Sequence, residues 1–152
     1  MRNLVLIGTI IMLISCNTPV YENFESFETN SWHTDSVITF NYTITDTISK
    51  YDLSLSIRHS VDYEYQNLFL FLESDTKDTI EIMLADKSGK WHGSGISNIR
   101  EFNYTFQKSK MFDKKGAYYL TIEQAMRYGD VEKIQHLENI TDIGLIISKH
   151  ND

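Results

Sequence analysis

Apolar and polar residues alternate with a period of two over much of the chain, and this pattern limits the fold more than any other feature. Ile38, Phe40, Tyr42 and Ile44 alternate with threonines and an asparagine, and residues 51–58 repeat the pattern after a polar turn. Successive side chains of a β-strand point to opposite faces, so each run predicts a strand with one buried face.

Further alternating runs predict strands at 80–84, 102–106, 118–122 and 143–147. Residues 67–72 are apolar on both faces, which predicts a central strand covered on both sides. Two stretches have helical composition: 122–128, which follows a strand and could extend it, and 131–137, which could form one or two turns. Seven or eight short strands joined by polar turns predict a mainly β fold, an antiparallel β-sandwich with the jelly roll as one form of it.

The N-terminus has the layout of a bacterial secretory signal peptide. One positive charge at Arg2 precedes an apolar run over 4–13 that is too short to span a bilayer, and Ser15 is the small residue before the cleavage site. Cys16 follows Leu-Ile-Ser, which resembles a lipobox. Such a chain is cut before the cysteine, whose thiol receives diacylglycerol and whose amino group receives an acyl chain such as palmitate. An ordinary secreted protein with a stray cysteine is the alternative.

These features divide the chain into a signal peptide at 1–15, an acylated cysteine with a polar, acidic tether at 16–30, and a folded domain at 31–152. Loss of Arg2 leaves 13 basic and 21 acidic side chains, a net charge of −8. This balance argues against nucleic acid or an anionic lipid surface as the main partner. Cys16 is the only cysteine, so no disulfide is expected, and no cofactor is expected beyond the covalent lipid.

No residue pattern predicts catalysis or metal binding. The five histidines lack the HxH, HxxxH and HxxE spacings that put two ligands on one face, so each is expected on the surface or in a turn. Gly89, Gly93 and Gly95 surround Trp91 and predict a tight bend. An enzyme would require at least two members of one set to meet in a cleft: His33, His59, His92, Asp62 and Glu64.

The segment 58–67 combines aromatic and hydrogen-bonding side chains, a mixture typical of binding surfaces. The two tryptophans could add flat stacking faces, or they could pack in the core. The candidate partner surface therefore comprises Trp32, Arg58, Tyr63, Tyr65 and Trp91.

Five stretches, in the right order, cover most of the mature domain and resemble the gliding motility lipoprotein GldH family of Bacteroidetes: 51–58, 67–71, 85–95, 119–127 and 140–145. The resemblance implies an outer-membrane lipoprotein grouped with the gliding machinery and the type IX secretion system. It implies no known enzyme activity, and only Cys16 carries over as a functional residue. Relatives also occur in bacteria that do not glide.

The leading hypothesis is a non-enzymatic, lipid-anchored β-sandwich that binds other gliding or secretion proteins of the envelope. It would sit in the outer membrane and face the periplasm, with the cell surface as the other location. The alternative is a module that binds glycan or peptidoglycan through Trp32, Trp91 and the Tyr63/Tyr65 segment.

Overall fold

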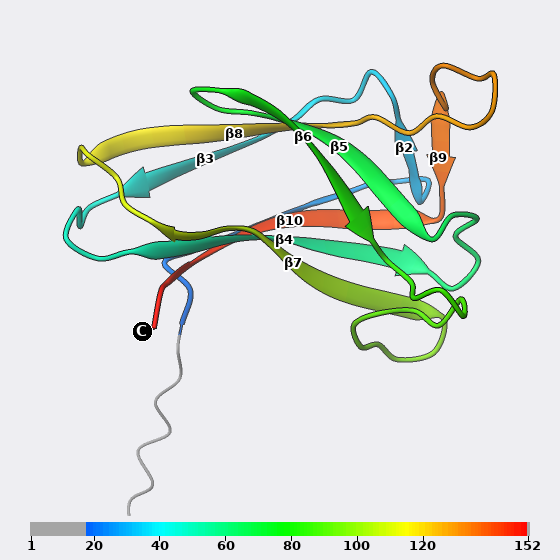
Figure 1. The fold of residues 1–152 in the computed structure, drawn as a ribbon, viewed down its shortest axis with the longest axis horizontal. Helices are drawn as coiled ribbons and strands as arrows, with labels where there is room; N and C mark the ends of the chain where they lie inside the picture. Colours follow the sequence, from blue (N-terminus) through cyan, green and yellow to red (C-terminus); the bar gives the residue numbers. More distant parts are fainter. Residues whose placement is uncertain (1–17, 152) are drawn as a thin grey trace, which may run out of the picture.

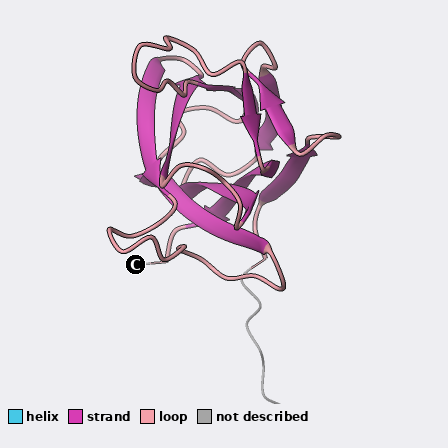
Figure 2. Cartoon of the chain, turned by 90° about the vertical axis from the view of Figure 1, so that its right-hand side faces the viewer, coloured by secondary structure: helices cyan, strands magenta, loops and turns pink. Residues whose placement is uncertain are grey.

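Two four-stranded antiparallel sheets pack face to face in the computed structural model, which describes residues 18–151 (Figures 1 and 2). The first sheet has the order β1–β10–β4–β7, formed by Tyr21–Ser26, Ile140–Lys149, Tyr51–Ser60 and Ile99–Lys110. The second has the order β3–β8–β5–β6, formed by Ile38–Ile44, Gly116–Gln124, Asn67–Glu73 and Lys77–Met83. A short pair, β2 (Ser31–His33) and β9 (His136–Glu138), completes the fold. The predicted signal peptide and Cys16 lie outside the described residues.

The strand order is that of a jelly roll. Without the short β2–β9 pair, eight long strands remain, and the first, eighth, third and sixth in chain order form one sheet. The second, seventh, fourth and fifth form the other, and every neighbouring pair is antiparallel. This wrapping matches a double-sheet jelly roll. The predicted antiparallel β-sandwich is confirmed.

The core lies between the sheets and consists of the inward residues of each alternating strand. In β3 the buried and exposed residues alternate without a break, as the sequence pattern predicts. Leu55 of β4 and Leu145 of β10 are paired in register and have no exposed surface. Burial of these apolar side chains supplies the main driving force for folding.

The strand β5 departs from its expectation. It is central in the sense that β6 and β8 bind its two edges, but only one of its faces is covered. Leu68 and Leu70 have no exposed surface, whereas Phe71 on the outer face is 48% exposed. The apolar run reflects partly exposed aromatic side chains rather than a second layer of structure.

The predicted helical turns at 131–137 are also wrong, since residues 18–151 contain no helix and therefore none long enough to cross a membrane. The first helix-like stretch instead completes β8 as far as Gln124. The Gln124 side chain then donates to Ile134 O at 2.6 Å and accepts from Met126 N at 2.9 Å. These contacts hold the following loop against the sheet, so tertiary contacts override the local helix propensity.

The segment expected to be a tether contains β1. Tyr21–Ser26 pair with β10 along their whole length, and Phe24 lies over Gly144, where a Cβ atom would approach the ring to 2.5 Å. The folded region thus begins before residue 31. The sequence of β1 shows no alternating pattern, because β1 is an edge strand in which only every third residue is even partly buried.

The two ends of the sandwich carry different connections. At one end lie both described chain ends and the connections 45–50 and 111–115, as Val20 N donates to Ile147 O and Tyr51 pairs with Lys149 and Lys110. We call this the terminal end. The opposite end, which we call the far end, carries the connections 61–66, 84–98 and 125–135 together with the β2–β9 pair (Figure 1).

Candidate functional site: an aromatic cluster at the far end

Trp32, the first residue predicted for the partner surface, is a core residue. Its side chain has no exposed surface, its ring stacks on Phe27 at 5.0 Å, and its indole Nε1 donates to Ser36 O at 2.9 Å. A buried tryptophan with a satisfied N–H offers no face to a ligand. The prediction of Trp32 as a surface residue is therefore wrong, and the alternative that it packs in the core is right.

Arg58 lies on the outer face of the first sheet. Its Nε donates to Glu101 Oε2 at 2.7 Å, and its guanidinium carbon lies 4.5 Å from the centre of the Phe24 ring. The hydrogen bond to Glu101 raises the pKa of Arg58 although burial opposes this. Arg58 is thus held by β1 and β7 rather than by the loops at the far end.

The other three residues of the predicted surface do come together. Tyr63 contacts Tyr65 at a ring separation of 5.6 Å and Trp91 at 6.4 Å. Two residues that the sequence analysis left out of this surface extend the group. His59 lies 4.6 Å from Trp91, and Tyr128 lies 6.1 Å from Tyr65. We call these five residues the far-end cluster.

Exposure increases across the far-end cluster. His59 and Tyr63 are buried, Trp91 and Tyr65 are partly buried, and Tyr128 is 70% exposed. The Tyr63 hydroxyl donates to Asn67 O at 3.0 Å, and burial raises the pKa of Tyr63 far above its usual range. The cluster therefore connects the core with the solvent-exposed tip of the 125–135 loop.

His59 corrects the expectation that all histidines lie on the surface or in turns. It has no exposed surface, and its Nδ1 lies 2.9 Å from Ser60 O. Burial lowers the pKa of His59, so the ring is neutral, with Nδ1–H donating to the carbonyl of Ser60. Nε2 is buried without a hydrogen-bond partner among the described residues. The ring acts as a packing surface for Trp91.

The 84–98 connection holds Trp91 in place through the predicted bend. Gly89 and Gly93 have positive φ angles of 83° and 77°, a region that favours glycine. A Cβ atom on Gly93 or Gly95 would lie within 2.0 Å of a carbonyl oxygen of β7. Asp86 Oδ1 accepts hydrogen bonds from Ser88 Oγ at 2.6 Å and from two backbone N–H groups, which lower the pKa of Asp86. The predicted bend at these glycines is confirmed.

Two of the histidines that an enzyme would require pack against other rings. The His33 ring packs against His136 at 4.7 Å, and the His92 ring packs against Phe102 at 5.5 Å. Asp62 accepts from Ser60 Oγ at 3.3 Å, and Glu64 is exposed. Within residues 18–151 no group of three or more His, Cys, Asp or Glu side chains is placed to hold a metal ion.

A hollow of about 500 Å³ adjoins the far-end cluster. Trp91 lines it together with Lys90, Arg100 and the glycines of the bend. Two cationic side chains and one indole side chain make the hollow chemically suited to an acidic or aromatic group.

The fold and this site define a small jelly-roll domain with an aromatic cluster that reaches the surface at one end. The chain belongs to the GldH lipoprotein family: the model of that family matches residues 19–147. A protein of Christiangramia forsetii described as a gliding motility lipoprotein GldH homolog is 38% identical over 97% of this chain and 95% of its own. The gliding motility lipoprotein GldH of Flavobacterium johnsoniae is 33% identical over 95% and 94%.

Among solved structures, the chain is similar to that of the infectious bursal disease virus Gx strain, at a TM-score of 0.34 and 15% identity. The match covers 97% of this chain and 38% of the viral chain. At this TM-score the similarity carries no argument about fold or function.

Proposed function

We propose that this lipoprotein is a non-enzymatic, lipid-anchored component of the envelope that supports gliding motility or type IX secretion by binding a protein partner at its far end. The family assignment supports the envelope setting. The position of the far-end cluster carries the rest of the proposal. It reaches the surface at the end of the sandwich opposite to the one at which the chain enters from Cys16.

The proposed anchor is the acylated Cys16, the only cysteine of the chain. A diacylglycerol thioether with an additional acyl chain such as palmitate gives stable attachment, whereas a single chain would be marginal. We place the protein in the outer membrane with its domain facing the periplasm. Labelling with radioactive palmitate should mark the protein, and Cys16→Ser should abolish both the label and its recovery with membranes.

The far end has the composition of a protein-binding surface. Four large apolar side chains are exposed around it: Met83 (46%), Ile96 (91%), Tyr128 (70%) and Val131 (54%). Aromatic residues and methionine are enriched at protein interfaces, and buried aromatic anchors contribute much of the binding energy. A partner that covered Tyr128 would extend an aromatic stack that already reaches Trp91 through Tyr65 and Tyr63.

A glycan- or peptidoglycan-binding role has less support. It requires aligned, exposed aromatic rings, but Trp32 is fully buried and Trp91 is partly buried and packs against His59. Glycan binding therefore serves as the alternative outcome of the experiment that follows.

The test places a photo-crosslinking amino acid at position 128 of the protein in its native organism. Position 119 is the matched control, because Tyr119 is 45% exposed and lies on β8 in the middle of the second sheet. We expect protein adducts of defined mass from position 128 and none from position 119. Tyr128→Ala should impair gliding or secretion more than Tyr119→Ala. Glycan adducts at position 128, or equal adducts at both positions, would overturn the proposal.

A further inference from the structure

We propose that the terminal end is a second membrane contact, at which lysines bind the phosphate groups of anionic phospholipids and two exposed apolar side chains enter the interface. This inference rests on the proposed anchor at Cys16. It assigns an orientation to the domain: the terminal end lies on the bilayer and the far end points away.

The first argument is the reach of the chain. Val20 N already donates to Ile147 O at 2.7 Å, and β1 begins at Tyr21. An extended chain spans at most about 3.6 Å per residue, so the four residues from Cys16 to Val20 reach roughly 14 Å. An acyl chain on Cys16 would therefore keep the terminal end close to the headgroups.

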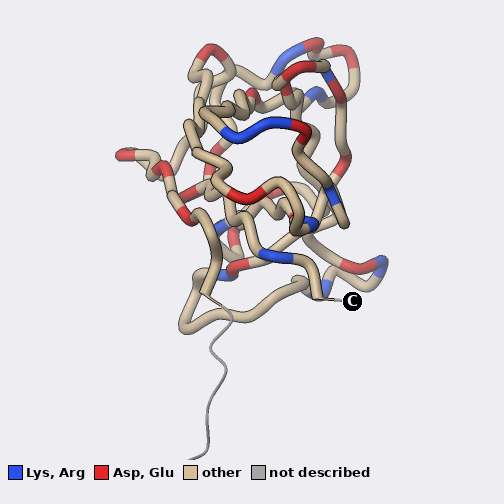
Figure 3. Tube along the Cα trace, turned by 90° about the vertical axis from the view of Figure 1, so that its left-hand side faces the viewer, with Lys and Arg blue, Asp and Glu red and all other residues tan. Residues whose placement is uncertain are grey.

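The second argument is charge. The connection from β7 to β8 and its flanks, 107–115, contains four lysines and one aspartate: Lys108, Lys110, Lys114, Lys115 and Asp113. This local excess of three positive charges contrasts with the net charge of −8 of the mature chain. Figure 3 views the molecule from the terminal end, with the lysine and arginine segments in blue. Lys108, Lys114 and Lys115 are exposed, and the Lys110 ammonium lies 5.1 Å from the Phe112 ring centre.

The acidic groups near these lysines are mostly engaged. Asp46 binds Lys149 Nζ at 2.8 Å, and Asp52 binds His150 Nδ1 and accepts from Ser109 N, both at 2.9 Å. Burial raises the pKa of Asp52, but the hydrogen bonds from His150 and Ser109 outweigh it and lower the pKa overall. Asp75 lines the same surface hollow as Lys108 and Lys114. The positive field of the lysines would attract anionic headgroups without displacing these pairs.

The third argument is exposed apolar surface. Met111 is 59% exposed and Ile48 is 89% exposed, and each lies in a connection at the terminal end. Exposed apolar side chains gain free energy when they move from water into the membrane interface. Lysines beside them are attracted to anionic lipid headgroups.

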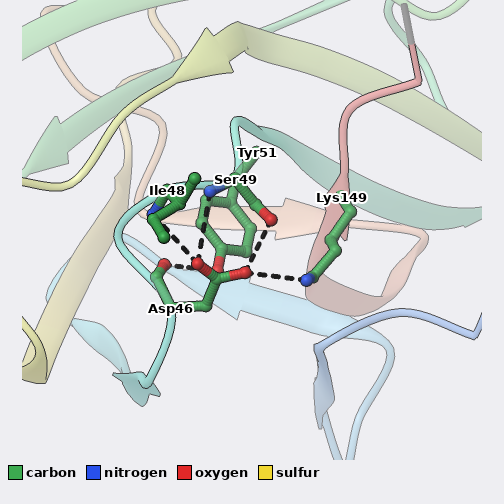
Figure 4. A network of polar contacts seen from close by, with 5 residues as sticks. All are labelled: Asp46, Ile48, Ser49, Tyr51 and Lys149. Carbon is green, nitrogen blue, oxygen red and sulfur yellow. Dashed lines mark hydrogen bonds and ion pairs between the residues drawn. The ribbon is translucent and has the colours of Figure 1, made fainter.

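Ile48 lies on a turn that is held by several hydrogen bonds to Asp46 (Figure 4). Asp46 Oδ1 accepts from Ile48 N at 2.9 Å, Asp46 Oδ2 accepts from Ser49 Oγ at 2.6 Å, and the buried Tyr51 donates its hydroxyl to Asp46 O at 2.6 Å. The hydrogen bonds from Lys149 and Ser49 hold the pKa of Asp46 well below its usual range. Insertion of Ile48 would therefore cost little conformational entropy.

The test uses purified lipidated protein in vesicles of phosphatidylcholine and phosphatidylglycerol that contain a headgroup-attached quencher. Acylation would consume the only native cysteine, so Met111→Cys, Ile48→Cys or Ile96→Cys each gives one site for a fluorescent label. Ile96 is the matched control, because it is 91% exposed but lies at the far end. We expect quenching at positions 111 and 48 and none at 96.

Charge neutralisation tests the lysines. Each lysine near an anionic surface contributes about 1 kcal/mol of binding free energy. In Lys114→Ala with Lys115→Ala, the ratio of domains that contact the membrane to domains that do not should therefore fall roughly 30-fold. Lys87→Ala with Lys133→Ala, both exposed at the far end, should leave quenching at position 111 unchanged. Equal quenching at 111 and 96, or none at 111 in protein that floats with vesicles, would overturn the membrane contact alone. Failure to float would overturn the anchor and the contact together.

Discussion

His59 is a buried histidine in a row of β4 side chains that face the core. Residues 51, 53, 55 and 57 of β4 all face the core, and position 59 continues this row. The alternation of β4 therefore indicates a buried side chain at position 59, although histidine is not an apolar residue.

Burial of His59 predicts a dependence of stability on pH. Its pKa in the folded protein is below the ordinary value of 6.5, so the unfolded chain binds more protons as the pH falls through 6.5. The stabilisation from a neutral His59 is complete above that pH and decreases below it. Thermal unfolding between about pH 7.5 and pH 5.5 should show a falling midpoint, and the fall should be smaller in His59→Gln.

The test compares how steeply the thermal midpoint falls with pH in the two proteins, because His59→Gln also changes packing and therefore the midpoint itself. His136→Gln is the control, because His136 is exposed on β9. An unchanged pH slope in His59→Gln would contradict the assignment.

At the scale of elements, the 84–98 connection depends on close contact with β7. Gly93 combines a positive φ angle with a position where a Cβ atom would lie 2.0 Å from Glu101 O. Gly93→Ala should lower the free energy of unfolding by about 3 kcal/mol, from backbone strain and from the clash.

The matched control is Gly129→Ala. Gly129 has a φ angle of 56°, but an added Cβ would meet nothing within 4 Å. It should cost only about 1 kcal/mol. Denaturant unfolding of both variants measures the difference, and equal costs would show that the contact with β7 yields to the added methyl group.

The position of β1 determines how far the N-terminus can be truncated without loss of stability. A chain that begins at residue 31, the boundary expected from composition, loses six paired residues along β10 and exposes that edge. It also loses Phe27 from its stack on Trp32. We expect at least about 3 kcal/mol of destabilisation relative to residues 16–152 with Cys16→Ser, together with self-association through the open edge.

Thermal unfolding and gel filtration of the two proteins measure these effects. Equal midpoints and a monomeric short form would place the boundary of the stable domain at residue 31.

Elements differ in how readily their sequence predicts them, for physical reasons. The strand β3 could be predicted because one face is buried and the other wet, so its sequence must alternate. The edge strand β1 could not, because backbone pairing with β10 holds it and its side chains remain mostly in water. Within the candidate site, Tyr63, Tyr65 and Trp91 were predicted. Tyr128 was not, because its loop resembled a helix.

At the scale of the whole molecule, net charge is a poor guide to surfaces. The value of −8 averages an acidic body with the lysines of 107–115. This average predicts that an anionic lipid surface is not the main partner, while the arrangement of the connections puts basic and apolar side chains at the terminal end. The order of strands in a jelly roll determines which connections share an end, and composition carries no trace of that order.

The pairing of β1 with β10 also determines how the domain would bear mechanical load. An anchor that pulls at Tyr21 while a partner pulls at the far end would draw β1 along β10. The hydrogen bonds of an antiparallel pair lie across the strands, so this pull loads all of them together in shear. A pull between residues 18 and 151, which lie at the same end, would instead peel the pair apart one bond at a time. Single-molecule stretching from residue 18 should therefore require a higher force when the second handle is at position 96 than at position 151. A strand loaded in shear would resist a pull on the proposed lipid anchor better than a strand that is peeled away.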